Sequence, residues 1–329
     1  MSDQGLLRLT WRPYRFVLPR SLITSRGSVV ERCGWLLRLQ APDGSVGWGE
    51  AAAPLLTGPS PALAAAVAAL PSDASRSDLE REIQALPAPL ACAFGMALAE
   101  LDGCGAISQG GWLRAPASAW LLPAGEAALS ELDRLLGGAI ARSDAPATFK
   151  WKVAALPDAL ERDLLEALLR RLPASAQLRL DANGGWDLAT AHHWADRLQE
   201  EPRLQWLEQP LVPDALGPLE ELASRIPVAL DESLPHLQSQ QRAVWPGWLV
   251  RRPLQEADPR PLLRELQAGL ARQMISTAFE TGIGRRFVEH LAALQALGPT
   301  PVAPGFAPGW RPDGALFAPD PEQVWEAAA

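Results

Sequence analysis

The spacing of hydrophobic and polar residues divides the chain into two parts near residue 115. In the first part, the runs 28–39 and 45–50 have strand character and flank the turn sequence Pro42-Asp43-Gly44. Three later runs, 61–70, 77–84 and 91–102, have helical character. This part is therefore expected to be a small antiparallel sheet with helices.

The second part alternates short β-rich runs with amphipathic helical runs such as 157–171. The strand candidates recur at intervals of about 20 to 30 residues and number eight: 118–122, 148–154, 177–182, 204–209, 228–231, 248–252, 273–279 and 300–303. Repeated βα units predict a parallel sheet, and eight of them most simply close into a barrel. A doubly wound open sheet is the alternative, although no glycine-rich nucleotide-binding turn follows the first strand.

Composition restricts the function. The 329 residues, 48% of them hydrophobic, are enough for one large domain and a smaller one with a sizeable core. A net charge of −8 argues against nucleic-acid or anionic-membrane partners and favours a small-molecule partner. Cys33, Cys92 and Cys104 lack metal-type or redox-type spacing, residues 1–16 lack a secretory pattern, and the apolar run 62–70 is too short to span a bilayer. We therefore expect a cytoplasmic protein.

Lysine occurs only at Lys150 and Lys152, although the chain has 30 basic residues. In an extended segment these two side chains point to the same side, so each should lower the pKa of the other. A desolvated lysine can then act as a general base near neutral pH, whereas arginine cannot give up its proton. The alternative is a solvent-facing lysine pair on a strand edge.

Three consecutive strand candidates end in acids, at Asp181, Glu208 and Asp231. Their separations of 27 and 23 residues each match one βα unit, so the carboxylates should meet at the C-terminal end of the barrel. Three oxygen donors without cysteine or histidine suit a hard divalent cation, best Mg²⁺. The alternative is that these acids cap helix N-termini. Asn183 and Glu232 lie just beyond the ligand positions and are expected to support them by hydrogen bonding.

The chain resembles the muconate-lactonizing subgroup of the enolase superfamily. Four motifs in order carry this resemblance: Lys150-x-Lys152, Asp181-Ala182-Asn183, Glu208-Gln209-Pro210 and Asp231-Glu232-Ser233. Within the subgroup, the o-succinylbenzoate synthase family is the most similar, through the segments 24–27, 31–34, 47–54 and 275–284. The resemblance covers nearly the whole chain.

The resemblance implies an α/β fold, namely a modified (β/α)8 TIM-type barrel with an N-terminal α+β capping domain. We expect the capping domain at residues 1–105 and the barrel with its metal site at 106–310. A C-terminal tail, 311–329, could pack against the capping domain.

One position departs from the family pattern. The family usually has a second catalytic lysine, followed by proline, at the end of the sixth barrel strand. Here Arg252 precedes Pro253, and Arg251 is the alternative alignment. Arginine keeps the positive charge but cannot take or return a proton. Racemases and epimerases need a base on each face of the substrate carbon, whereas a syn elimination needs one, so the substitution favours a dehydratase. It could instead mean impaired activity.

The resemblance implies a carbon–oxygen lyase, an o-succinylbenzoate synthase. Its reaction is the syn dehydration of 2-succinyl-6-hydroxy-2,4-cyclohexadiene-1-carboxylate to o-succinylbenzoate in menaquinone or phylloquinone biosynthesis. The implied metal is Mg²⁺, with Mn²⁺ as a substitute, bound by Asp181, Glu208 and Asp231. Other enzymes of the subgroup, a cycloisomerase or an N-succinylamino acid racemase or dipeptide epimerase, are the alternatives, and a non-catalytic scaffold barrel is a further one.

The same resemblance implies roles for further residues. Lys152 would be the base, Lys150 would tune it, and Arg252 would stabilise the enediolate from the opposite face. Ser276 and Thr277 could hydrogen-bond a substrate carboxylate. Arg179 faces the same way as Asp181, and it either reaches the succinyl arm of the substrate or forms a salt bridge inside the barrel.

Overall fold

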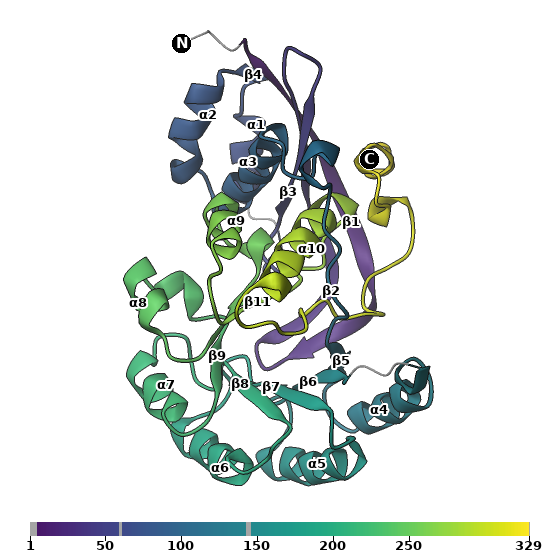
Figure 1. Ribbon diagram of the computed structural model, residues 1–329, viewed down its shortest axis with the longest axis vertical. Coiled ribbons are helices and arrows are strands. Elements are labelled where there is room, and N and C mark those ends of the chain that lie inside the picture. The colour runs from purple at the N-terminus through teal and green to yellow at the C-terminus, as the bar shows by residue number, and fades with distance from the viewer. Residues whose placement is uncertain (1–4, 59–60, 143–145, 329) are drawn as a thin grey trace.

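The computed structural model describes residues 5–58, 61–142 and 146–328. Figure 1 shows an antiparallel sheet with its helices at one end of the molecule and a parallel sheet flanked by helices at the other. The parallel sheet curls like part of a barrel wall (Figure 1). This arrangement agrees with the α/β fold class expected from the sequence.

The N-terminal sheet has the strand order β3-β2-β1-β4. Its strands are β1 (Leu7–Thr24), β2 (Gly27–Gln40), β3 (Val46–Ala52) and β4 (Asp73–Ala74). The predicted hairpin 28–50 corresponds to β2 and β3, and Gly44 N donates to Ala41 O at 3.0 Å in the turn between them. The long strand β1 was not predicted. Pro13 and Pro19 weaken its strand pattern, and its pairing with β2 is irregular between Val17 and Leu22.

Three helices accompany this sheet at the predicted places: α1 (Pro61–Ala68), α2 (Arg76–Glu82) and α3 (Ala88–Leu101). Helix α3 packs directly on β3. A Cβ atom at Gly47 or Gly49 would lie 2.0 Å from the backbone oxygen of Ala97 or Ala93, respectively. Only glycine therefore allows this close approach of helix and strand.

The parallel sheet contains seven strands in sequence order, which confirms seven of the eight strand candidates. They are β5 (Trp120–Leu122), β6 (Thr148–Lys152), β7 (Gln177–Asp181), β8 (Leu204–Glu208), β9 (Val228–Leu230), β10 (Trp248–Arg251) and β11 (Gln273–Ile275). Each strand pairs in parallel with the next one in the chain.

The predicted eighth strand, 300–303, is wrong, because no strand is formed there. Instead, Gly305 forms a parallel bridge with Ser276 beyond β11, and Ala119 N donates to Pro304 O at 2.9 Å next to β5. Proline has no N–H to donate, which limits ladder formation in this proline-containing segment. The two edges of the curled sheet are thus joined by an irregular segment.

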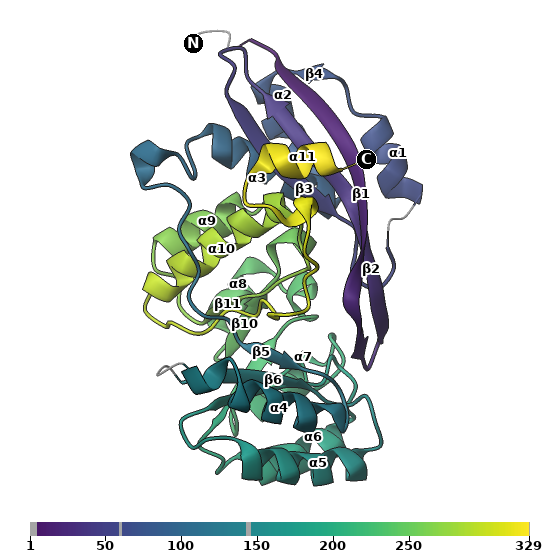
Figure 2. The same cartoon turned by 90° about the vertical axis from the view of Figure 1, so that its right-hand side faces the viewer.

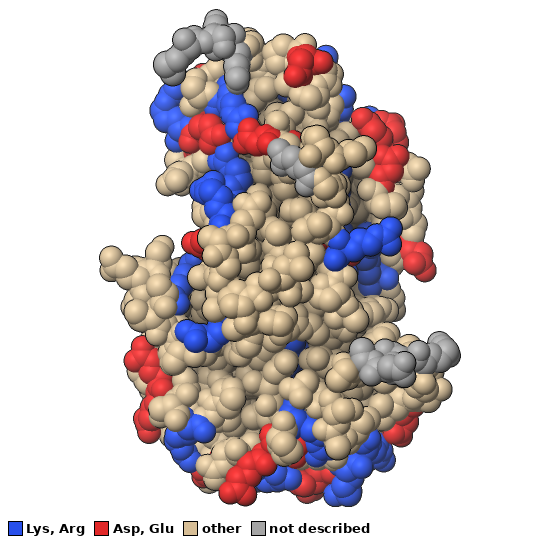
Figure 3. Space-filling model, viewed as in Figure 1, with Lys and Arg blue, Asp and Glu red and all other residues tan. Residues whose placement is uncertain are grey.

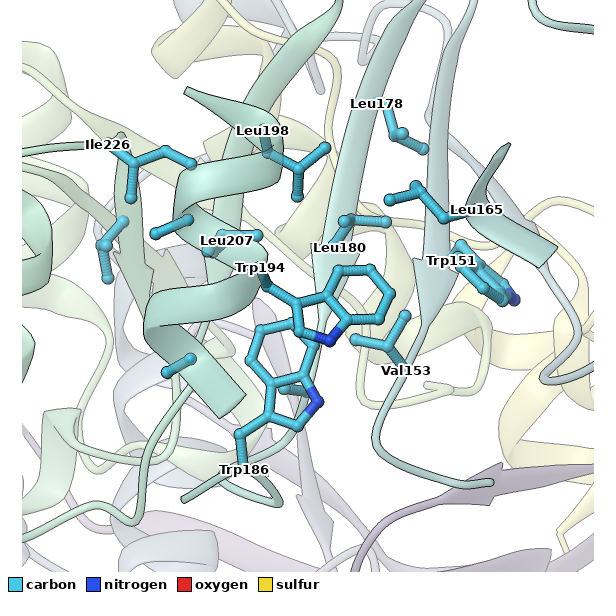
Figure 4. Close-up of a cluster of buried hydrophobic side chains, with 14 of the residues drawn as sticks. Trp151, Val153, Leu165, Leu178, Leu180, Trp186, Trp194, Leu198, Leu207 and Ile226 are labelled. Carbon is cyan, nitrogen blue, oxygen red and sulfur yellow. The ribbon is translucent and has the colours of Figure 1, made fainter. Parts of the chain in front are cut away.

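Helices cover the outer face of the parallel sheet: α4 (Ala127–Gly137), α5 (Asp158–Arg171), α6 (Leu188–Leu198), α7 (Leu216–Ala223), α8 (Ser239–Val244), α9 (Arg260–Gln267) and α10 (Gly282–Leu297). Figure 4 shows part of the core between strands and helices, with Trp151 and Leu180 of the sheet near Leu165 and Trp194 of α5 and α6. Because side chains alternate along a strand, the neighbouring residues of these strands point into the barrel.

The last helix, α11 (Pro321–Ala327), returns to the N-terminal sheet, as Figure 2 shows. Arg12 Nη1 donates to Trp325 O at 2.7 Å, and the Trp325 ring lies 5.5 Å from the ring of Trp48. On the face seen in Figure 3, acidic and basic side chains are interspersed rather than gathered into one continuous basic patch. No helix within the described residues is long and apolar enough to cross a membrane.

Candidate active site and metal centre

The two lysines lie inside the barrel, on the side of β6 opposite the core residues Phe149 and Trp151. Lys150 is 7% exposed and Lys152 is 5% exposed. Strand β6 is also an inner strand, between β5 and β7. The alternative of a solvent-facing pair on a strand edge is therefore excluded.

Both lysines contact the acid at the end of the neighbouring strand. Lys152 Nζ donates to Asp181 Oδ2 and to Asn183 Oδ1, each at 2.7 Å. Lys150 Nζ lies 2.7 Å from the same Asp181 oxygen and 2.5 Å from Glu208 Oε1. The strand register brings these side chains together, because Lys152 of β6 pairs with Asp181 of β7, which pairs with Glu208 of β8.

These contacts reverse one expectation about acidity. Burial acts to lower the pKa of Lys150, but the carboxylates of Asp181 and Glu208 outweigh it and raise this pKa above its usual value. The prediction that the lysine pair lowers this pKa is therefore wrong, because ion pairs with carboxylates dominate over repulsion between ammonium groups. Asp181 shows the reciprocal effect: burial opposes ionisation, yet Lys150 and Lys152 lower its pKa.

The three predicted ligands end or follow adjacent strands. Asp181 and Glu208 are the last residues of β7 and β8, and Asp231 follows β9 directly. Asp181 and Glu208 are fully buried, and Asp231 is 8% exposed. Burial, together with the charges of Asp181 and Asp231, raises the pKa of Glu208 to about 7. The site thus gathers three buried carboxyl groups at the ends of adjacent strands.

Arg252 directly follows β10, the strand next to β9, and contacts the last of these acids. Its Nε and Nη2 donate to Asp231 Oδ2 at 3.0 and 2.5 Å, and its Nη1 donates to Thr277 O at 2.8 Å. Arg251 instead pairs with Glu256 and Gln273 and does not line the cavity. The structure therefore supports aligning Arg252, rather than Arg251, with the family's second lysine.

Asn183 and Glu232 connect the lysines to the acids. Asn183 Nδ2 donates to Glu232 Oε1 at 3.0 Å, and the backbone N–H of Asn183 donates to Asp181 Oδ1 at 3.0 Å. The Oε2 atom of Glu232 is buried and has no hydrogen-bond partner among the described residues. Burial and the charges of Asp231 and Asp181 raise the pKa of Glu232 to about 7.

The acids of the site suit a divalent cation by their chemistry, although not by their present spacing. In the described part of the chain, no three Asp, Glu, His or Cys side chains are grouped tightly enough to hold a metal ion as they stand. Lys150 bridges two of the acids, and Arg252 contacts the third. The donor set still fits Mg²⁺, because all donors are carboxylate oxygens. When all four acids (Asp181, Glu208, Asp231 and Glu232) are ionised, their negative charges exceed the positive charges of Lys150, Lys152 and Arg252.

A cavity of about 450 Å³ adjoins these groups. The barrel contributes Lys150, Lys152, Asp231 and Arg252 to its wall, and the N-terminal part contributes apolar residues that include Leu22, Val29, Pro54, Leu55 and Leu56. Figure 2 shows the β1–β2 hairpin extending alongside the parallel sheet. At the hairpin turn, Ser25 Oγ donates to Ala182 O at 3.0 Å. Both parts of the molecule therefore line the cavity.

Ser276 and Thr277 also line the cavity, but Arg179 does not. Arg179 lies two residues before Asp181 on β7, level with Lys150 and Trp206 in the strand register. Its Nη2 donates to Ala303 O at 2.7 Å and its guanidinium stacks 4.1 Å from the Trp206 ring. Burial lowers its pKa to about 9. Within the described residues Arg179 pairs with no carboxylate, so the salt-bridge interpretation is wrong, and its absence from the cavity wall gives the substrate-arm interpretation no support.

Two polar residues that shape the site were not identified from the sequence. Gln209 Oε1 accepts the backbone N–H groups of Asp231 and Ser233, at 3.1 and 3.0 Å, and so fixes the end of β9 against β8. Glu161 accepts three consecutive backbone N–H groups, of residues 154–156, in the turn after Lys152. These bonds are made with backbone groups, which carry no residue-type signal that a sequence pattern could reveal.

Comparison with known proteins places the chain among enzymes of one family. Residues 138–247 match the family model described as enolase C-terminal domain-like. The o-succinylbenzoate synthase of Thermosynechococcus vestitus is 36% identical over 301 residues, which are 87% of this chain and 88% of that protein.

Solved structures agree with this. The o-succinylbenzoate synthase of Thermosynechococcus elongatus BP-1, complexed with Mg in its active site, superposes with a TM-score of 0.77 at 32% identity, covering 97% of this chain and 99% of that one. The muconate lactonizing enzyme of Pseudomonas fluorescens has a TM-score of 0.72 at 20% identity, covering 97% and 89%, and so shares the fold. With a relative at 36% identity matched over nearly its full length, the chain belongs to the o-succinylbenzoate synthase family of the enolase superfamily.

Proposed function

We propose that this chain catalyses the Mg²⁺-dependent syn dehydration of 2-succinyl-6-hydroxy-2,4-cyclohexadiene-1-carboxylate to o-succinylbenzoate. Family membership supports the reaction, and one observation carries the choice within the superfamily. The cavity has lysine amines on the β6 side, whereas a guanidinium, that of Arg252, stands across the curled sheet. A single base suffices for a syn elimination, because the base that removes the α-proton can return it to the departing hydroxide on the same face.

Lys152 is the proposed base. Its amine is held by Asp181 and Asn183, each 2.7 Å away, so its position relative to the cavity is defined before substrate arrives. The amine takes the proton α to the ring carboxylate and then donates it to the leaving hydroxyl group. Lys150 compensates the charges of Asp181 and Glu208. Arg252 stabilises negative charge on the substrate from the opposite side.

Asp181, Glu208 and Asp231 are the proposed holders of the metal. When bound, Mg²⁺ supplies positive charge that stabilises the developing negative charge of the substrate and favours the neutral form of nearby amines. Mn²⁺ has similar ligand preferences and is an expected substitute. Ser276 and Thr277 are proposed to hydrogen-bond a substrate carboxylate, because both line the same cavity.

The proposed reaction belongs to menaquinone or phylloquinone biosynthesis and is expected in the cytoplasm. We also propose that residues 1–105 act as the capping domain, 106–310 as the barrel and 311–329 as a tail. The contact of Trp325 with Arg12 and Trp48 supports grouping the tail with the cap. Wall residues from β1 and β2 support the capping role, since they line the same cavity as the lysines.

One assay tests the proposal directly. Purified protein is mixed with the cyclohexadiene substrate, and o-succinylbenzoate formation is followed with Mg²⁺ and with EDTA. We expect turnover that depends on Mg²⁺ and returns when Mg²⁺ is added back. Absence of turnover with Mg²⁺ present would refute the assignment. Efficient racemisation of an N-succinyl amino acid in D₂O would instead favour the racemase alternative and indicate a second base.

A further inference from the structure

Glu50 is a fully buried carboxylate of the N-terminal sheet that reaches into the barrel part. It lies on β3 beside Trp48, on the face opposite the glycines that contact α3. The helix that it meets is α10, a 16-residue helix that follows β11. Neither the lysine motif nor the acid motifs involve this residue.

The carboxylate of Glu50 occupies the start of α10. Its Oε2 accepts the N–H groups of Thr281 and Gly284, at 3.1 and 3.0 Å, and the hydroxyl of Thr281 at 2.6 Å. Its Oε1 accepts the Tyr14 hydroxyl at 2.7 Å. A Cβ atom at position 284 would lie 2.6 Å from Oε2, so glycine leaves the room for this approach. Glu50 thus neutralises helix-terminal donors that would otherwise be buried without an acceptor.

This contact joins two of the segments that line the cavity, one from each part of the molecule. Glu50 lies just before residues 54–57, which form the cap side of the cavity wall. Thr281 lies just after Ser276, Thr277 and Phe279, which form part of the barrel side. The first segment follows the end of β3 and the second precedes the start of α10, and Glu50 joins β3 to α10 between them.

Two further ties connect the same segments nearer to the cavity. The buried Arg32 donates from Nε to Ala278 O at 3.0 Å and from Nη2 to Ala53 O at 2.7 Å. Gln255 Oε1 accepts the Leu55 N–H at 3.1 Å. The Gln255 tie joins two neutral groups, whereas Arg32 supplies a charged donor and Glu50 a charged acceptor, and hydrogen bonds of charged groups are stronger.

We infer that Glu50 is a positioning residue that holds the cap segment 53–57 and the barrel segment 276–281 in register, and so sets the affinity for substrate. It contacts neither the cavity nor the lysines, so it acts through the two wall segments. Its loss should loosen the wall contributed by the cap while leaving Lys152 and its partners in place. This inference rests on the proposed function for its kinetic readout.

The test compares Glu50→Gln with Glu100→Gln. Glutamine keeps the size of Glu50 but turns an N–H group toward N–H donors. Glu100 is a matched control, because it also joins the N-terminal part to α10, through Trp48 N at 2.9 Å and Arg286 Nη2 at 2.6 Å, but does not line or flank the cavity. We expect Glu50→Gln to raise KM about tenfold or more while kcat stays within about threefold, and Glu100→Gln to change neither beyond about twofold.

Hydrogen–deuterium exchange provides a readout that does not depend on turnover. Peptides covering 53–57 and 276–281 should exchange about tenfold faster in Glu50→Gln than in wild type, and at the wild-type rate in Glu100→Gln. If wild type fails to turn over the substrate, the proposed function fails, and exchange still decides the role of Glu50. Wild-type exchange and KM in Glu50→Gln, or equal effects of the two substitutions, would overturn the inference.

A milder variant covers the case in which Glu50→Gln does not fold. Tyr14→Phe removes one donor to Glu50 and keeps the ring in place, so the fold should persist. We expect faster exchange in the same two segments and a smaller rise of KM, by about two- to fivefold. Unchanged exchange in both segments would overturn the inference on its own.

Discussion

Replacing Lys152 by arginine separates two properties that lysine supplies at this position, positive charge and a removable proton. The side chain is 5% exposed, and its Nζ lies 2.7 Å from both Asp181 Oδ2 and Asn183 Oδ1. Arginine retains the charge that Asp181 requires, but its guanidinium stays protonated at any working pH. Any loss of activity that exceeds a change in binding therefore reports proton transfer.

The expected fall in kcat of Lys152→Arg is the contribution of proton transfer alone. A positioned general base contributes about 100- to 10,000-fold to the rate, which corresponds to about 2.7 to 5.4 kcal/mol of activation free energy. We expect kcat of Lys152→Arg to fall at least about 1,000-fold.

The assay is o-succinylbenzoate formation with saturating Mg²⁺, with product binding measured by calorimetry to show that the cavity persists. Lys150→Arg is the control, because it keeps positive charge beside Asp181 and Glu208 and leaves Lys152 intact. We expect this control to lose less than about 100-fold in kcat. A Lys152→Arg enzyme within tenfold of wild-type kcat would refute the assignment of the base.

Other perturbations test the remaining parts of the site and the fold. The substitutions Asp181→Asn, Glu208→Gln and Asp231→Asn should each weaken Mg²⁺ binding in calorimetric titration and lower turnover by orders of magnitude, and near-wild-type activity in any two would remove the metal-site proposal. Arg252→Ala should lose about 2 to 4 kcal/mol of transition-state stabilisation in kcat/KM, whereas Arg252→Lys should keep substantial activity. Wild-type enzyme in D₂O should exchange the α-hydrogen of at most one enantiomer of an N-succinyl amino acid, and efficient racemisation would contradict the one-base mechanism. Burial lowers the pKa of His290, so the folded state binds fewer protons than the unfolded state, and stability should be full at neutral pH and fall as pH drops below about 6.5. His290→Asn, which can still accept the Leu113 N–H, should show a smaller drop in urea midpoint between pH 7.5 and pH 5, and an unchanged drop would count against His290 as the source.

The sequence by itself determined the fold class and the side of each strand that faces the barrel. Alternation within a strand has period two, so Lys150 and Lys152 had to share a face, and regular βα spacing had to bring adjacent strand ends together. Local patterns of this kind depend only on neighbours in the chain. They were sufficient to find seven parallel strands and to place Lys152 and Asp181 on consecutive ones, where Lys152 Nζ lies 2.7 Å from Asp181 Oδ2.

Only the tertiary structure decided which side chains line the cavity, which ones contact each other and how their charges balance. Arg179 faces the barrel interior as its position in the strand predicts, but its guanidinium lies over the Trp206 ring and does not line the cavity. The pKa of Lys150 rises because carboxylates from two other strands touch its amine, and no local pattern ranks that attraction against repulsion from Lys152. Glu50 caps a helix that begins more than 200 residues later in the chain. These outcomes depend on distances between segments remote in sequence, and electrostatic energies change steeply with such distances in a buried site.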